Sequence, residues 1–155
     1  MERHLMKNLL LDVSAYGEKD YKLFLDIVKQ ELDMSKYTDV TAPQALLLLK
    51  MNENVVTIGE VITRGYYIGT NASYSINRLM QAGYMTSEKS NYDKRNTYLK
   101  LTSKGLALCS QIENALEEHI KLTEKKSKNK LDLNFGLDFL KRLERFFLDI
   151  LHYRK

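Results

Sequence analysis

The chain has few of the residues that interrupt helices or cross-link a fold. Its 155 residues include one proline, seven glycines, one cysteine and no tryptophan. So few helix-breaking residues indicate long helices joined by short loops. The single cysteine, Cys109, excludes an internal disulfide, and a reducing compartment such as the cytoplasm is expected. The sequence also lacks a run of about 18 apolar residues, so we expect no membrane-spanning helix.

Positive charge is in excess and is concentrated in one segment. The whole chain has 24 Lys and Arg against 20 Asp and Glu, which gives a net charge of +4. Between residues 62 and 104, seven basic residues oppose only Glu88 and Asp93, so this window alone has a charge of +5. A segment that neutralises DNA phosphates requires such a local excess.

Apolar residues at helical spacing predict helices on both sides of the basic segment. Residues 2–14 are expected to form a short helix or an arm, and residues 16–34 an amphipathic helix. A very apolar run that follows Pro43 predicts a helix buried on every side, with the proline in its first turn. Two more amphipathic helices are expected at 102–124 and 132–153. The predicted fold is therefore mainly α.

The segment 57–105 predicts a helix, a turn, a second helix and a β-hairpin. Its opening letters, TIGE, match a capping box that begins a helix. The second helix is expected from about Asn71 to Gly83, because glycine favours the left-handed conformation that ends a helix. Alternating residues from Thr97 predict a strand after the polar loop EKSNYDKRN. These parts make up a winged helix-turn-helix, in which the hairpin is the wing.

Polar residues on the second helix and the hairpin are candidate DNA contacts. Arg pairs with guanine, and Asn with adenine, through two hydrogen bonds each. A basic hairpin can lie along phosphates or enter a minor groove. A carboxylate two residues before an arginine can hold the guanidinium extended. The candidates are Asn71, Ser73, Tyr74, Asn77 and Arg78 in the helix, Lys89, Lys94 and Arg95 in the hairpin, and Asp93 as the wing-orienting residue.

The hairpin also carries a family resemblance. The letters DKRNTYLKLTSKG, from Asp93 to Gly105, resemble the wing signature of the MarR family of transcriptional regulators, D-x-R-x3-[apolar]-x-L-T-x2-G. The preceding NRL and GY are similar to the end of that family's recognition helix. More narrowly, TRGYYIGTNASYSINRL and the closing RLERFFLDIL resemble an alphaproteobacterial subgroup that includes the L,D-transpeptidase regulator. The subgroup resemblance implies control of cell-wall remodelling or stress genes.

The family resemblance implies an intertwined homodimer that binds a pseudo-palindromic operator. Residues 1–155 would form a single domain, with the winged helix-turn-helix at 41–105 and a helical dimerisation region at 2–34 and 106–155. The outer helices independently have more apolar surface than a monomer of this size easily covers. The family also implies a small phenolic or aromatic effector between the dimerisation region and the DNA-binding head. The candidate lining residues are Tyr16, Phe24, Tyr66 and Tyr67.

Other functions remain open from the residues alone. The winged helix could be a protein-interaction module, or the chain could be a non-specific architectural DNA-binding protein. Cys109 lies on the apolar side of its helix, which favours a buried inert thiol over a redox sensor. No Gly-rich phosphate loop, nucleophile elbow or metal-type His spacing is present, so we expect no enzyme activity, no cofactor and no metal.

Overall fold

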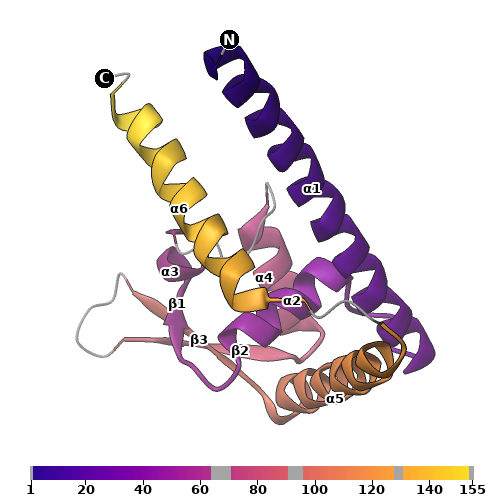
Figure 1. Cartoon of the computed structure of the whole chain (residues 1–155). Helices are drawn as coiled ribbons and strands as arrows, with labels where there is room; N and C mark the ends of the chain where they lie inside the picture. The colour runs from indigo at the N-terminus through magenta and orange to yellow at the C-terminus, as the bar shows by residue number, and fades with distance from the viewer. Residues whose placement is uncertain (1, 64–70, 91–95, 128–130, 154–155) are drawn as a thin grey trace. The chain divides into compact units, whose positions relative to one another are not determined.

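The computed structural model of the chain describes residues 2–63, 71–90, 96–127 and 131–153. It forms two compact units, Met1–Glu117 and Glu118–Lys155. The elements are α1 (Glu2–Met34), α2 (Ala42–Met51), β1 (Val56–Thr57), α3 (Ile58–Thr63), α4 (Ala72–Gln81), β2 (Met85–Lys89), β3 (Thr97–Leu101), α5 (Ser103–Lys126) and α6 (Leu133–His152) (Figure 1). The observed fold, mainly helices with one small sheet, is the predicted fold class. Among these helices none is long and apolar enough to span a membrane. The predicted single domain over 1–155 stays a prediction.

The first helix is longer than the sequence predicts. The separate short helix or arm expected at 2–14 is wrong, because α1 runs without a break from Glu2 to Met34. A Cβ atom at Gly17 would meet nothing within 4 Å, so no packing disturbs the helix at this glycine. A glycine inside an exposed helix costs only about 1 kcal/mol relative to alanine. The helix-forming residues on both sides outweigh that cost.

The helix at the centre of the first unit is α2. Ala45, Leu47 and Leu48 have no exposed surface, which confirms the predicted burial on every side. The helix begins after Thr41, whose N–H donates a hydrogen bond to Gln44 Oε1 at 2.9 Å. Residues from α1, α4, the sheet and α5 pack around it. The buried core includes Val28, Leu32, Ala45, Leu47, Leu48, Val61, Ile76, Leu79, Tyr84, Met85, Leu99, Leu108 and Ile112.

The sheet is antiparallel, with strand order β1-β3-β2. Val56 in β1 lies opposite Leu99 in β3, so the short first strand pairs with the hairpin. The second strand, β2, continues to Lys89, which lies opposite Thr97. The sequence placed Lys89 in the polar loop, and that placement is wrong because cross-strand pairing extends the strand through it. The loop residues 91–95 lie outside the described residues.

Local capping bonds begin the helices of the head. Thr57 N–H donates to Glu60 Oε2 at 2.8 Å and Glu60 N–H donates to Thr57 Oγ1 at 3.1 Å, so the predicted capping box is confirmed. Asn71 Oδ1 accepts a hydrogen bond from the Tyr74 N–H at 3.1 Å at the start of α4. Gly83 follows α4 with a φ of +80°, as predicted. The turn predicted at 65–69 lies outside the described residues.

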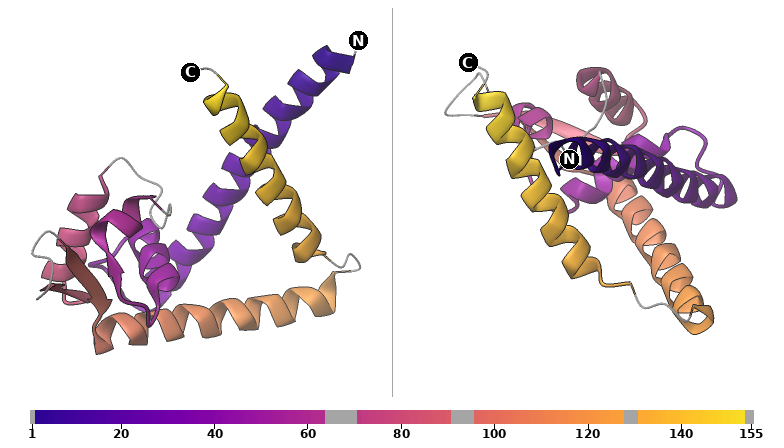
Figure 2. Two further views of the ribbon diagram at one scale, coloured as in Figure 1. Left: turned by 90° about the vertical axis from the view of Figure 1, so that its left-hand side faces the viewer. Right: turned by 45° about the horizontal axis from the view of Figure 1, so that its top comes forward.

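Two long helices follow the wing. Thr102 Oγ1 accepts from the Gly105 N–H at 3.2 Å and so caps α5, which continues to Lys126 as one helix (Figure 2). Asp132 Oδ1 accepts from the Phe135 N–H at 2.9 Å and caps α6. None of the residues of α6 is buried. Both helices lie where the apolar periodicity predicts them.

Gly105 is the glycine that packing requires. A Cβ atom there would lie 2.2 Å from the backbone oxygen of Tyr84, so one of the two backbone segments would have to move. We expect Gly105→Ala to lower the free energy of unfolding by about 2 kcal/mol or more, the cost of overpacking. Urea unfolding followed by circular dichroism measures it. The matched control, Gly17→Ala, should raise stability by about 1 kcal/mol. Equal effects of the two substitutions would contradict the close contact.

Candidate nucleic-acid interface

The fourth helix divides into a buried face and an exposed polar face. Ile76 and Leu79 are buried, whereas Ser73, Tyr74, Asn77 and Arg78 are exposed, as the sequence predicts. Ser73 and Asn77 are four residues apart, as are Tyr74 and Arg78, so these side chains form neighbouring rows on one surface. This surface offers hydroxyl, amide and guanidinium groups together.

Asn71 is partly used by the helix that it begins. Its Oδ1 accepts the Tyr74 N–H, which leaves the side-chain NH₂ group to donate to an acceptor such as a phosphate oxygen. Two-bond pairing with adenine needs both the oxygen and the nitrogen of the amide. That pairing is therefore favoured for the exposed Asn77 and not for Asn71.

The basic residues of the head divide into paired and available groups. The Lys100 ammonium donates to the Glu88 carboxylate across the hairpin, and Lys104 pairs with Asp39 at 3.0 Å. Arg78 and Lys89 are exposed and form no ion pair with any residue that the structure describes. The two pairs reduce the charge that the basic segment offers to a polyanion. The other predicted wing residues, Asp93, Lys94 and Arg95, lie outside the described residues.

A polar cluster that the sequence analysis missed lies at the end of α4. The Tyr84 hydroxyl donates to Asp39 Oδ1 at 2.6 Å, and Lys104 Nζ donates to Asp39 Oδ2 at 3.0 Å. The Lys104 ammonium also lies 4.1 Å from the centroid of the Tyr84 ring. We call Asp39, Tyr84 and Lys104 the Asp39 cluster. Its members are 45 and 65 residues apart in sequence, so no local pattern signals it.

The cluster changes the acidity of its members. The Tyr84 hydroxyl and the Lys104 ammonium hold the pKa of Asp39 below its ordinary value of 3.8. Burial, followed by the bond to the carboxylate, raises the pKa of Tyr84. At neutral pH Asp39 is therefore a carboxylate and Tyr84 a neutral phenol.

Cys109 is a buried thiol on α5. Burial, with a smaller contribution from Glu113, raises its pKa to about 11. The thiol is therefore protonated at neutral pH, and a protonated thiol is a poor nucleophile. This environment agrees with the predicted inert thiol.

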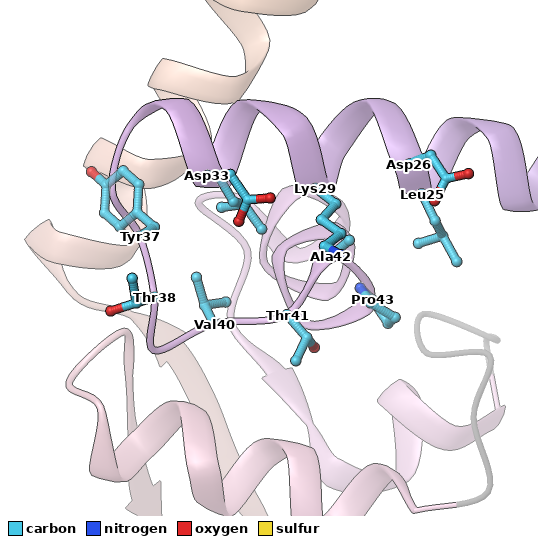
Figure 3. A pocket seen from close by; sticks show the side chains of 11 residues that line it. Leu25, Asp26, Lys29, Asp33, Tyr37, Thr38, Val40, Thr41, Ala42 and Pro43 are labelled. Atoms are coloured by element: carbon cyan, nitrogen blue, oxygen red, sulfur yellow. The ribbon is translucent and has the colours of Figure 1, made fainter.

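A shallow pocket of about 500 Å³ lies between α1 and the segment that leads into α2 (Figure 3). Its lining mixes apolar, hydroxyl and charged side chains. The lining residues are Leu25, Asp26, Lys29, Leu32, Asp33, Tyr37, Thr38, Val40, Thr41, Ala42 and Pro43. Tyr16 and Phe24 are not among them and have exposed fractions of 66% and 40%. Tyr66 and Tyr67 lie outside the described residues.

The central region matches a known family model. Residues 40–105 match the family described as the winged helix DNA-binding domain. This interval contains α2, α3, α4 and all three strands, together with the first residues of α5. The fold and this match define the class of the head, a winged helix of the DNA-binding type.

Most of the chain is similar to solved structures and to one curated protein. AbfR of Staphylococcus epidermidis superposes with a TM-score of 0.77 at 17% identity, covering 96% of this chain and 99% of AbfR. A mutant of MarR from E. coli in complex with operator DNA gives 0.64 at 20% identity, covering 87% and 94%. The fold of this chain is therefore similar to that of these two proteins. The exopolysaccharide II synthesis transcriptional activator ExpG of Rhizobium meliloti (strain 1021) is 28% identical over 133 residues, 86% of this chain and 69% of that protein.

The low pKa of Asp39 predicts a pH-dependent contribution to stability. The folded state favours the carboxylate, so the stabilisation is present above the ordinary value of 3.8 and is lost as pH falls through the lower folded pKa. We expect Asp39→Asn to cost about 1 kcal/mol at pH 7, since the side chain is half exposed and water screens it.

Urea unfolding at pH 7 and pH 3 measures this dependence, and the difference between the two proteins should shrink at pH 3. The control is Asp138→Asn, which removes the exposed pair with Arg142 on α6 and should change stability little at either pH. A cost of Asp39→Asn that is the same at both pH values would contradict the assignment.

Proposed function

We propose that this chain is a sequence-specific DNA-binding transcriptional regulator of the MarR type, located in the cytoplasm, and not an enzyme. The observation that carries the proposal is the exposed polar face of α4 inside a segment that matches a winged helix DNA-binding domain. The similar proteins support it, because ExpG is described as a transcriptional activator and the MarR mutant is bound to operator DNA.

In this proposal α4 enters the major groove of DNA. Asn77 and Arg78 read base edges, since both are exposed and have the groups for two-bond contacts with adenine and guanine. Asn71, Ser73 and Tyr74 contact phosphates or flanking bases. Lys89 begins the phosphate contacts of the wing. From the sequence pattern, Lys94 and Arg95 continue them, with Asp93 as the orienting carboxylate.

The surface of α6 supports a homodimer. Successive residues of a helix are rotated by about 100°, so most apolar residues of α6 fall into two neighbouring stripes, with Leu143 between them. One stripe has Leu133, Leu137, Leu140, Phe147 and Leu151, and the other has Phe135, Phe139, Phe146 and Ile150, all of them exposed. A single neighbouring helix covers about one stripe. A second copy of the chain supplies the remaining cover, and the dimer then binds half-sites about 10 bp apart in a pseudo-palindromic operator.

The genes and the effector are a further part of the proposal. The subgroup resemblance supports control of cell-wall remodelling or stress genes, and ExpG is named for activating exopolysaccharide synthesis. We propose that a small aromatic effector binds in or beside the pocket that Tyr37 lines, of which the predicted residues Tyr16 and Phe24 are not part. A screen of phenolic acids for a rise in melting temperature tests this. If none of these phenolic acids alters either the melting temperature or DNA binding, the proposal of an effector is contradicted.

Two rival functions predict different behaviour with DNA. A winged helix that contacts proteins selects no duplex from a random library. A non-specific architectural protein binds duplex DNA with steep salt dependence but enriches no palindrome. Selection from random duplexes at moderate salt, followed by footprinting, separates both rivals from a regulator.

A substitution in α4 tests the reading helix on the selected duplex. Arg78→Ala should weaken binding by about 1–3 kcal/mol and relax the preference at one base position. The matched control is Arg142→Ala, which removes the same charge from α6, where the arginine is exposed. Fluorescence anisotropy measures both affinities. Equal losses would mean that net charge, and not the position of Arg78, decides binding.

A substitution in α6 tests the dimer. Phe147→Glu places a charge in an apolar stripe, so we expect dissociation to monomers at micromolar concentration in sedimentation velocity. Asn134→Glu adds the same charge on the polar side of α6 and should leave the dimer intact. If Phe147→Glu remains a dimer, α6 is not the interface.

A further inference from the structure

The end of α4 is fixed to the beginning of α5. The carbonyl of Ala82 accepts a hydrogen bond from Lys104 Nζ at 2.7 Å, and that of Gly83 accepts from Thr102 Oγ1 at 2.6 Å. The next carbonyl, of Tyr84, accepts from the Thr102 N–H at 3.0 Å. Ala82 is the C-cap residue of α4, and Gly83 and Tyr84 follow it along the chain. Here three successive carbonyls are bound by two residues at the start of α5.

Asp39 holds the lysine in this arrangement. A lysine side chain is long and flexible, and it loses conformational entropy when it is held in one position. Asp39 Oδ2 and the face of the Tyr84 ring contact the Lys104 ammonium, while Asp39 Oδ1 accepts the Tyr84 hydroxyl. Tyr84 has no exposed surface, so the ring is a fixed support.

The backbones in this junction are in close contact. A Cβ atom at Gly105 would lie 2.2 Å from the Tyr84 oxygen and 3.2 Å from a side-chain carbon of Leu101. No space for a side chain separates Gly105, in the first turn of α5, from the backbone of Tyr84. The end of α4 and the start of α5 therefore move together.

We propose that Asp39 and Lys104 are positioning residues for DNA binding, which fix the direction of α4 relative to α5. This inference rests on the proposed function. Lys104 acts through the Ala82 carbonyl and Asp39 and contacts no phosphate. Since α5 continues to Lys126 as one helix, a rigid junction passes any change in the position of α5 to α4.

The alternative role for Lys104 is a phosphate contact, because half of its side chain is exposed. The two roles differ in their salt dependence. Loss of one phosphate contact reduces the slope of log affinity against log salt by about 1. Loss of a positioning residue lowers affinity and leaves the slope unchanged.

The test compares full-length Lys104→Gln, Asp39→Asn and the double variant on the selected duplex over a series of salt concentrations. We expect each single variant to lose affinity about five- to tenfold. The slope of log affinity against log salt should remain equal to that of the wild type. The double variant should lose no more affinity than one single variant does. Lys89→Gln is the control, and its slope should fall by about 1. A lower slope for Lys104→Gln, or additive losses in the double variant, would overturn the positioning role.

A second measurement needs no DNA. Amide hydrogen exchange should quicken at Tyr84 and Thr102 in Lys104→Gln and Asp39→Asn, while exchange in the α2 core stays slow. Unchanged exchange at these amides would overturn the rigid junction whether or not the chain binds DNA. A wild-type chain that selects no duplex would instead contradict the proposed function, and the exchange result alone would then decide whether the junction exists.

Discussion

The contact between Gly105 and the backbone oxygen of Tyr84 is the constraint on which the head depends. It brings the first turn of α5 against the backbone of Tyr84, and only a residue without a Cβ atom fits there, because an added Cβ would lie 2.2 Å from the Tyr84 oxygen. This contact places Thr102 and Lys104 within reach of the Gly83 and Ala82 carbonyls, which follow α4. The buried Tyr84 then turns its hydroxyl to Asp39, so the segment before α2 joins the same junction. The final glycine of the wing pattern thus has a packing reason.

The sequence predicted those features whose causes are local. The capping box at Thr57 acts on a residue three positions away, so its letters suffice to predict it. The Asp39 cluster could not be predicted, because its members meet only after the chain folds. The break expected after residue 14 is wrong, because α1 continues through Gly17, where an added Cβ atom would meet nothing within 4 Å.

For the basic segment, too, the composition predicts the net charge, whereas only the folded positions determine which cations are available. The sequence gives +5 for the segment 62–104, and that total describes the field which attracts a polyanion from a distance. It does not tell which cations are available at contact. Two carboxylates, Glu88 and Asp39, each hold a lysine of this segment. The positive charge on the described head is therefore of two kinds, with Arg78 and Lys89 available to a ligand and Lys104 used to hold the fold together.

The last helix ties the proposed dimer to the stability of the chain. Most of the stability of a helix in a protein comes from tertiary packing. The helix α6 has 20 residues, none of them buried, so it gains little from such packing. Two apolar stripes would gain about 25 cal/mol for each Å² that a partner covers. In a homodimer this burial would stabilise α6 and the association together, so the folded fraction of α6 would rise with protein concentration. Operator occupancy would then depend on concentration more steeply than one DNA-binding step allows, because association must precede the simultaneous binding of two α4 helices.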